Sequence, residues 1–202
     1  GPSLFTLNSW DHRNTRLEWY GNVNYRFIFQ RQSNFGVYAN LGHERLRPAD
    51  FSTLSANRDY PHSQRGFWFN SGYFKQVVFG GEANWGQATN FNPANGPPVL
   101  ARSNFASLYA TIRPVAGLTI DNTYLLQRLR DEIAGADFNN HILRSKWNYQ
   151  FNREFSLRLI GQYTTVLANP LRSGLPSTKQ FNADALLTYL VHPGTAVYLG
   201  YN

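Results

Sequence analysis

The chain has 202 residues, of which 42% are hydrophobic, 16% are aromatic and only 15% are charged. An ordinary soluble domain is about a quarter charged, so this chain is poor in charge and rich in rings. It has no apolar run close to the roughly 20 residues that a membrane-spanning helix needs. It has no cysteine, which excludes disulfides and thiolate metal sites. The formal net charge is +7, but Lys and Arg are scattered singly, so we expect no nucleic-acid partner.

Apolar and polar residues alternate with a period of two along most of the chain, which predicts antiparallel β-strands. In chain order, the predicted strand pairs are residues 21–30 with 37–44, 67–74 with 77–87, 105–113 with 118–126, 143–151 with 155–164, and 180–189 with 197–201. A further strand over residues 4–10 would precede them. Tight turns are predicted near positions 32, 75, 115, 152 and 193.

Longer polar connections separate these pairs and contain most of the prolines. They cover residues 43–64, 88–103, 128–139 and 168–179. Short turns at one end and long loops at the other, with strands of about 9 to 13 residues, are typical of a transmembrane barrel. We therefore predict an all-β fold, a single antiparallel up-and-down transmembrane β-barrel domain over residues 1–202. It would have about ten strands in this chain and would be closed here or belong to a larger barrel.

The alternation gives each predicted strand two different faces. The polar face mixes charges of both signs with Asn, Gln and Thr, as a hydrated lumen does. The residues predicted to line the lumen are Arg26, Glu44, Glu82, Asp121, Arg144, Lys146, Arg158 and Asp184. The other face carries Trp and Tyr near strand ends, as the interfacial girdle of a membrane barrel does. The predicted lipid-facing girdle is Trp19, Trp85, Trp147, Tyr149, Tyr163, Tyr189 and Tyr201.

Two hairpin motifs in the C-terminal third, "YQFNREFSLR" at residues 149–158 and "YLVHPGT" at residues 189–195, carry a resemblance to a known family. This region resembles the outer-membrane barrel of uncharacterised bacterial exported proteins that have an N-terminal β-sandwich of the family-9 carbohydrate-binding type. The resemblance implies the outer membrane of a Gram-negative bacterium, with the lipid bilayer as partner. It also implies an N-terminal periplasmic module or partner chains, and no established activity. Because the chain lacks the final aromatic strand of that group, we expect it to be a portion of a longer barrel.

Residues able to support chemistry are present but not grouped into a motif. The five histidines, which are His12, His43, His62, His141 and His192, do not have metal-ligand spacing, so neither a metal nor a cofactor is expected. Asp11 with His12, or Asp59 with His62, could supply an acid and a base, with Ser63 or Ser103 as nucleophile. The loop aromatics Phe51, Tyr60, Phe91 and Phe138 would either stack on sugars or pack the loops together.

These observations lead to three hypotheses about function. The first is an outer-membrane, porin-like barrel that acts as a pore or as a membrane anchor, with a polar lumen and no enzymatic activity. The second is a soluble β-barrel with its apolar face inside, which binds a ligand such as a carbohydrate. The third is an outer-membrane hydrolase with its active site at the loop rim. Dependence on detergent separates the first hypothesis from the second.

Overall fold

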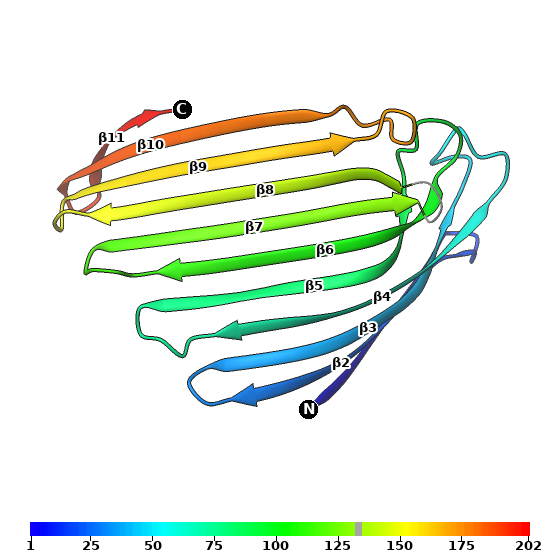
Figure 1. Ribbon diagram of the computed structural model, residues 1–202, viewed down its shortest axis with the longest axis horizontal. Helices are drawn as coiled ribbons and strands as arrows, with labels where there is room; N and C mark the ends of the chain where they lie inside the picture. The colour runs from blue at the N-terminus through cyan, green and yellow to red at the C-terminus, as the bar shows by residue number, and fades with distance from the viewer. Residues whose placement is uncertain (132–134) are drawn as a thin grey trace.

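The computed structural model describes residues 1–131 and 135–202, and these form one antiparallel sheet of eleven strands in chain order, without an α-helix (Figure 1). The strands are β1 (Pro2–Trp10), β2 (Arg16–Phe29), β3 (Ser33–Leu46), β4 (Arg58–Ser71), β5 (Val77–Asn90), β6 (Val99–Ile112), β7 (Leu118–Asp131), β8 (Gly135–Gln150), β9 (Phe155–Ala168), β10 (Thr178–His192) and β11 (Thr195–Tyr201). The up-and-down antiparallel topology is confirmed, and the predicted strand over residues 4–10 is present as β1. No helix in the described residues is long and apolar enough to cross a bilayer.

The short turns lie where they were predicted, but the strands are longer than predicted. Each of β2 to β10 contains 14 to 16 residues, so the predicted connection 43–64 shrinks to residues 47–57. Pro61, which was predicted to lie in a connection, instead lies inside β4 opposite His43. The pairing of β4 with β5 begins only at Gln64, so the missing N–H of Pro61 leaves no gap on that side. Of the predicted connection 128–139, residues 132–134 lie outside the described part.

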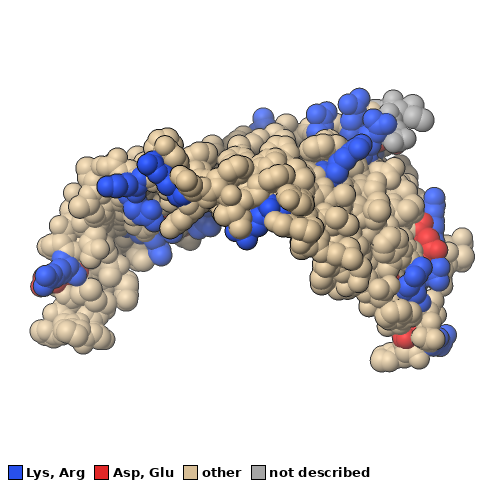
Figure 2. Space-filling view, turned by 90° about the horizontal axis from the view of Figure 1, so that it is seen from below, with Lys and Arg blue, Asp and Glu red and all other residues tan. Residues whose placement is uncertain are grey.

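The register gives the sheet two distinct faces, because residues paired directly across neighbouring strands lie on the same side. One face is hollowed: residues of β2, β3, β4 and β5 together line an open depression there of about 360 Å³. Figure 2 shows the arched profile of the molecule. We call the hollowed side the concave face and the opposite side the convex face. The side chains of the convex face splay outward, and Val23, Leu41 and Leu143 on it are all more than half exposed.

Four strand glycines on the concave face each lie directly opposite an aromatic or imidazole ring on a neighbouring strand. The pairs are Gly36 with Trp68, Gly42 with His62, Gly66 with Tyr38, and Gly80 with Tyr109. A Cβ atom at Gly36 would lie 2.3 Å from Trp68 Cε2, and one at Gly80 would lie 2.6 Å from the Tyr109 hydroxyl oxygen. The rings thus occupy the space that side chains at these glycines would need. This lets polar and aromatic groups fit inside the curved face.

The sheet has almost no conventional core. In the described residues the buried hydrophobic side chains are few, and the one cluster, Leu46, Leu54 and Tyr60 with Phe51 against it, lies at the long-loop end. The edge strands β1 and β11 do not pair with each other in the described part of the chain, so the sheet is open rather than a closed barrel. The large apolar side chains of the convex face are left without a covering layer.

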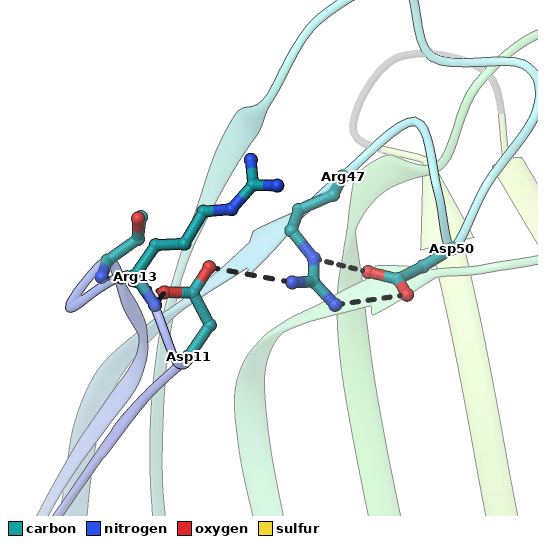
Figure 3. Close-up of polar contacts among 5 residues, drawn as sticks. Asp11, Arg13, Arg47 and Asp50 are labelled. Atoms are coloured by element: carbon teal, nitrogen blue, oxygen red, sulfur yellow. Dashed lines mark hydrogen bonds and ion pairs between the residues drawn. The ribbon is translucent and has the colours of Figure 1, made fainter.

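At the long-loop end, Arg47 ties the β1–β2 turn to the β3–β4 loop (Figure 3). Its Nε donates to Asp50 Oδ2 at 2.9 Å, and its Nη1 lies 3.7 Å from Asp11 Oδ2. Asp11 Oδ1 accepts the backbone N–H groups of Arg13 and Thr15, both at 2.9 Å. One arginine therefore holds together two loops from different hairpins.

Removing the Arg47 charge is expected to change the titration of Asp50 more than that of Asp11. The backbone N–H of Thr15 is the main group that lowers the pKa of Asp11, whereas the Arg47 side chain is the main group that lowers the pKa of Asp50. In Arg47→Met the Asp50 pKa should rise towards 3.8, its ordinary value, while the Asp11 pKa moves less. Carboxyl ¹³C NMR titration measures both shifts.

The sign of the pH effect follows from the direction of these shifts. A carboxyl group whose pKa is lower in the folded protein stabilises that state above its unfolded pKa, and the contribution disappears as the pH falls through the folded value. The loop contacts should therefore persist at pH 5 and be lost only below about pH 3.8. Equal movement of the Asp11 and Asp50 titrations in Arg47→Met would contradict the assignment of Arg47 mainly to Asp50.

Candidate functional site on the concave face

The register places all eight predicted lumen residues on the concave face and all seven predicted girdle residues on the convex face. Glu82, for example, lies opposite Trp68 and Ser107, and Arg144 lies opposite Thr123 and Gln162. The other concave-face residues of the set are Arg26, Glu44, Asp121, Lys146, Arg158 and Asp184. The convex-face set is Trp19, Trp85, Trp147, Tyr149, Tyr163, Tyr189 and Tyr201. This placement groups each set on one side, and the water and lipid contacts of the two sides stay predictions.

Amide side chains and rings line the cavity in the middle of the concave face. Asn22 Nδ2 donates to Asn40 Oδ1 at 2.6 Å across β2 and β3. The Tyr38 hydroxyl reaches over Gly66 and donates to Glu82 Oε1 at 2.5 Å, while it accepts from Asn84 Nδ2 at 3.1 Å. Tyr38 thus connects β3 to β5 across the intervening strand, over the position where Gly66 has no side chain. The alternating Asn residues of β2 and β3 are visible in the sequence, but they were not among the predicted lumen residues.

A second cavity of about 380 Å³ continues the hollow towards the long loops. Tyr20 and Gln64 line both cavities, so the two adjoin along the strands. The buried Asn90 lines this second cavity, and its Nδ2 donates to Asp137 Oδ2 at 3.3 Å. Desolvation at this buried position disfavours a charged carboxylate unless donors accompany it, and Asn90 supplies one such donor. The hollow of the concave face therefore continues from the middle of the strands to the loop end, where Leu129, Phe138 and Leu175 also line it.

Charges of both signs lie on the concave face, and three basic side chains are grouped on two neighbouring strands. Glu44 and Glu82 lie on β3 and β5, whereas Arg144, Lys146 and Arg158 lie on β8 and β9. Lys146 Nζ lies 3.3 Å from Asp121 Oδ2, so one basic group is partly neutralised. The face is thus basic over β8 and β9, whereas β2 to β5 combine Glu44 and Glu82 with Arg26. A charged solute that contacts this face would meet both signs of potential.

The structure separates the residues considered for a hydrolase. Asp59 and His62 lie on opposite faces of β4, because Asp59 pairs with Arg45 and His62 pairs with Gly42. The Asp59 carboxylate binds the Arg45 guanidinium at 2.6 Å, and Asp11 is held by its own turn and by Arg47. Ser63 lies on the convex face and Ser103 on the concave face. Asp59 and His62 therefore do not form the acid–base pair that was considered, and the Asp11 carboxylate is bound by groups other than His12.

The five histidines lie on different elements of the fold. His12 lies in the β1–β2 turn, and His192 ends β10. His43 and His141 lie on the convex face beside Trp19 and Tyr124, with ring centroids 6.1 and 6.2 Å apart. Within residues 1–131 and 135–202, no group of three or more His, Asp or Glu side chains is arranged to hold a metal ion.

The loop aromatics pack against the protein itself. Phe51 stacks on Phe91 with ring centroids 5.9 Å apart, which joins the β3–β4 and β5–β6 loops. Tyr60 is 1% exposed and donates its hydroxyl to the Pro98 carbonyl at 2.7 Å. Phe138 lines the cavity at the loop end. Of the two roles considered for these rings, the structure gives Phe51, Tyr60 and Phe91 a role in packing the loops together.

Replacing Tyr38 by Phe is expected to destabilise the protein by about 1–3 kcal/mol, because the change leaves the Glu82 carboxylate and the Asn84 amide without their shared partner. The free energy of unfolding, measured by urea titration, checks this. Tyr163→Phe is the matched control, since the Tyr163 hydroxyl has no hydrogen bond within the described residues and lies on the convex face. Equal stability of the two variants would mean that the Tyr38 contacts contribute nothing.

No family model, no curated protein and no solved structure matches this chain. The resemblance of the C-terminal hairpins to exported bacterial barrels therefore stays a prediction.

Proposed function

We propose that this chain forms the wall of an outer-membrane β-barrel, with the convex face in lipid and the concave face in water. The wall would line a pore or anchor a neighbouring module to the membrane. The main observation in support is the composition of the convex face. It presents a continuous set of large, uncovered apolar side chains, including Val23, Leu41 and Leu143. Monomeric soluble proteins rarely expose an apolar surface of this extent, and a bilayer would cover it.

The direction of curvature is the second support for the membrane assignment. A sheet that closes along its observed bend keeps its concave, amide-rich face inside and its apolar face outside. A soluble barrel needs the reverse arrangement, with the apolar face packed in the core. The soluble ligand-binding alternative would therefore require the sheet to bend in the opposite direction.

The length of the apolar band suits a membrane as well. On β5 the convex-face residues from Val77 to Trp85 are apolar and are followed by Gln87. Eight residue steps along a strand cover roughly 26 Å. A strand tilt of about 40° shortens this to roughly 20 Å along the membrane normal, close to the band of about 25 Å that outer-membrane barrels present.

The concave face would act as the wet surface of such a barrel. Its Asn, Gln and Tyr groups would replace part of the hydration of a polar solute, and its charges of both signs would orient a charged or dipolar one. Further strands, from the same protein or from partner chains, would pair with the edges of β1 and β11, because a barrel in lipid needs every backbone group paired.

Membrane insertion is the direct test of this proposal. The full chain is refolded with phosphatidylcholine vesicles, floated on a density gradient, and compared with the same chain refolded without lipid or detergent. We expect co-flotation with the vesicles and resistance of the strands to added protease. A monodisperse, folded protein in plain buffer that does not float with lipid would overturn the membrane assignment and favour the soluble binder.

A further inference from the structure

Arginines gather at one place on the convex face, at the long-loop edge of the apolar band. Arg65 lies on β4, Arg102 on β6, and Arg128 and Arg130 on β7. Arg65, Trp85, Asn104 and Arg128 lie in one row across four strands. Arg102 lies directly opposite Arg130 in the next row. We call these four arginines the arginine patch. Figure 2 shows Lys and Arg side chains gathered on the outer, convex outline of the arch at its upper right.

The arginine patch surrounds a hollow rather than a flat surface. Arg65, Arg102 and Arg130 line a cavity of about 550 Å³ together with Trp85, Gln87 and Asn104. Neutral donors thus stand beside the charged ones. A cavity of this size could admit a headgroup-sized ligand.

Three of the four arginines of the patch have no acidic partner within the described residues. Arg65, Arg128 and Arg130 make no ion pair in residues 1–131 and 135–202. Arg128 Nε is buried and has no hydrogen-bond partner there. Neighbouring cations on paired strands repel each other, and a buried donor without a partner costs free energy. An anion in the cavity would offset the repulsion among Arg65, Arg102 and Arg130, which line it.

We propose that the arginine patch binds the phosphate of an anionic membrane lipid in the leaflet on the long-loop side. The site has the chemistry for this, because guanidinium groups bind phosphate oxygens through paired, charge-assisted hydrogen bonds. It also has the position, since it lies next to Trp85, where the apolar band of the convex face ends. A lipid phosphate lies at this depth, directly above the acyl chains. The inference rests on the proposed membrane insertion, which puts the convex face against lipid.

Lipid binding is tested on the full chain in detergent by native mass spectrometry, with phosphatidic acid as the probe and phosphatidylcholine as the neutral comparison. We expect phosphatidic acid to be retained in preference to phosphatidylcholine. The double variant Arg65→Gln/Arg130→Gln should bind phosphatidic acid about ten-fold more weakly or worse. The matched control Arg113→Gln/Arg153→Gln removes the same charge at the short-turn end and should bind as the unchanged chain does. Equal loss in both double variants, or no preference for phosphatidic acid, would overturn the site.

Two further arms separate the possible outcomes. The first arm adds inorganic phosphate in excess. We expect it to displace phosphatidic acid only weakly, because the acyl chains of the lipid also contact the convex face. Complete displacement would mean that the site takes free phosphate instead. Flotation of the Arg65→Gln/Arg130→Gln variant with phosphatidylcholine vesicles is measured in parallel. Normal flotation without selective lipid binding refutes the arginine patch alone, whereas loss of flotation in every form of the chain refutes the membrane insertion itself.

Discussion

Arginine in place of Val23 is expected to destabilise the lipid-inserted protein by about 2–4 kcal/mol. Val23 lies in the middle of β2 on the convex face, where it is 58% exposed and pairs with Leu4 and Ala39. If this face contacts the hydrocarbon core, the guanidinium group must lose its hydration or distort the bilayer. The free energy of unfolding from phosphatidylcholine vesicles, followed by tryptophan fluorescence in urea, measures the cost.

The adjacent residue provides a matched control for the Val23 substitution. Asn24 is the next position of the same strand and faces the concave side, where its Oδ1 is buried and has no hydrogen-bond partner within the described residues. Asn24→Arg introduces the same side chain at nearly the same depth, and in a wet interior it should change the stability by about 1 kcal/mol or less. A small effect of both substitutions would show that the convex face does not contact lipid.

Alanine in place of Gly66 is expected to cost about 2–3 kcal/mol, the range for overpacking a close contact. A Cβ atom there would lie 2.4 Å from the Ala83 carbonyl oxygen and 2.8 Å from Tyr38 Cζ. The carbonyl belongs to the neighbouring strand β5, so it cannot move without disturbing the β4–β5 ladder. The Tyr38 ring would also be pushed away from Glu82, which opens the cavity wall. Urea unfolding gives the stability, and proteolysis of the β4–β5 hairpin reports local loosening.

Gly161→Ala is the appropriate comparison for Gly66→Ala. Gly161 also lies inside a long strand, but a Cβ atom there would approach only the Phe181 ring, at 3.8 Å, which is ordinary contact. That substitution should leave the stability unchanged or raise it by a few tenths of a kcal/mol, because alanine restricts the unfolded chain. If the two variants lose the same stability, strand glycines matter here for a reason other than the space that the rings occupy.

Several features of this fold were predictable because they are local. A period of two puts Arg144 and Lys146 on one side of a strand and Trp147 and Tyr149 on the other, whatever the strand pairs with. Pro193 and Gly194 likewise mark a turn by their own backbone preferences. The two proposed faces, the five short turns and the antiparallel order therefore followed from the residues.

Other features could not be predicted because they depend on register between separate segments. The strand ends were misplaced at Pro61, which the sequence marks as loop chemistry but the β3–β4 pairing holds inside a strand. The pairing of Asp59 with His62 was wrong for the same reason: once both lie in one strand, an odd spacing puts them on opposite faces. The rings of Trp68 and Tyr109 meet Gly36 and Gly80 only because of the registers of β3 with β4 and of β5 with β6.

The sequence by itself determined that this protein is an antiparallel meander with one polar and one apolar face, since alternation along a strand is a property of each short segment. Only the tertiary structure decided which face is hollow, how Tyr38 reaches Glu82 over an intervening strand, and that Arg65 joins Arg102 and Arg130 around one cavity. Curvature and cross-strand neighbours arise from pairing between residues far apart in the chain, and no local pattern encodes them.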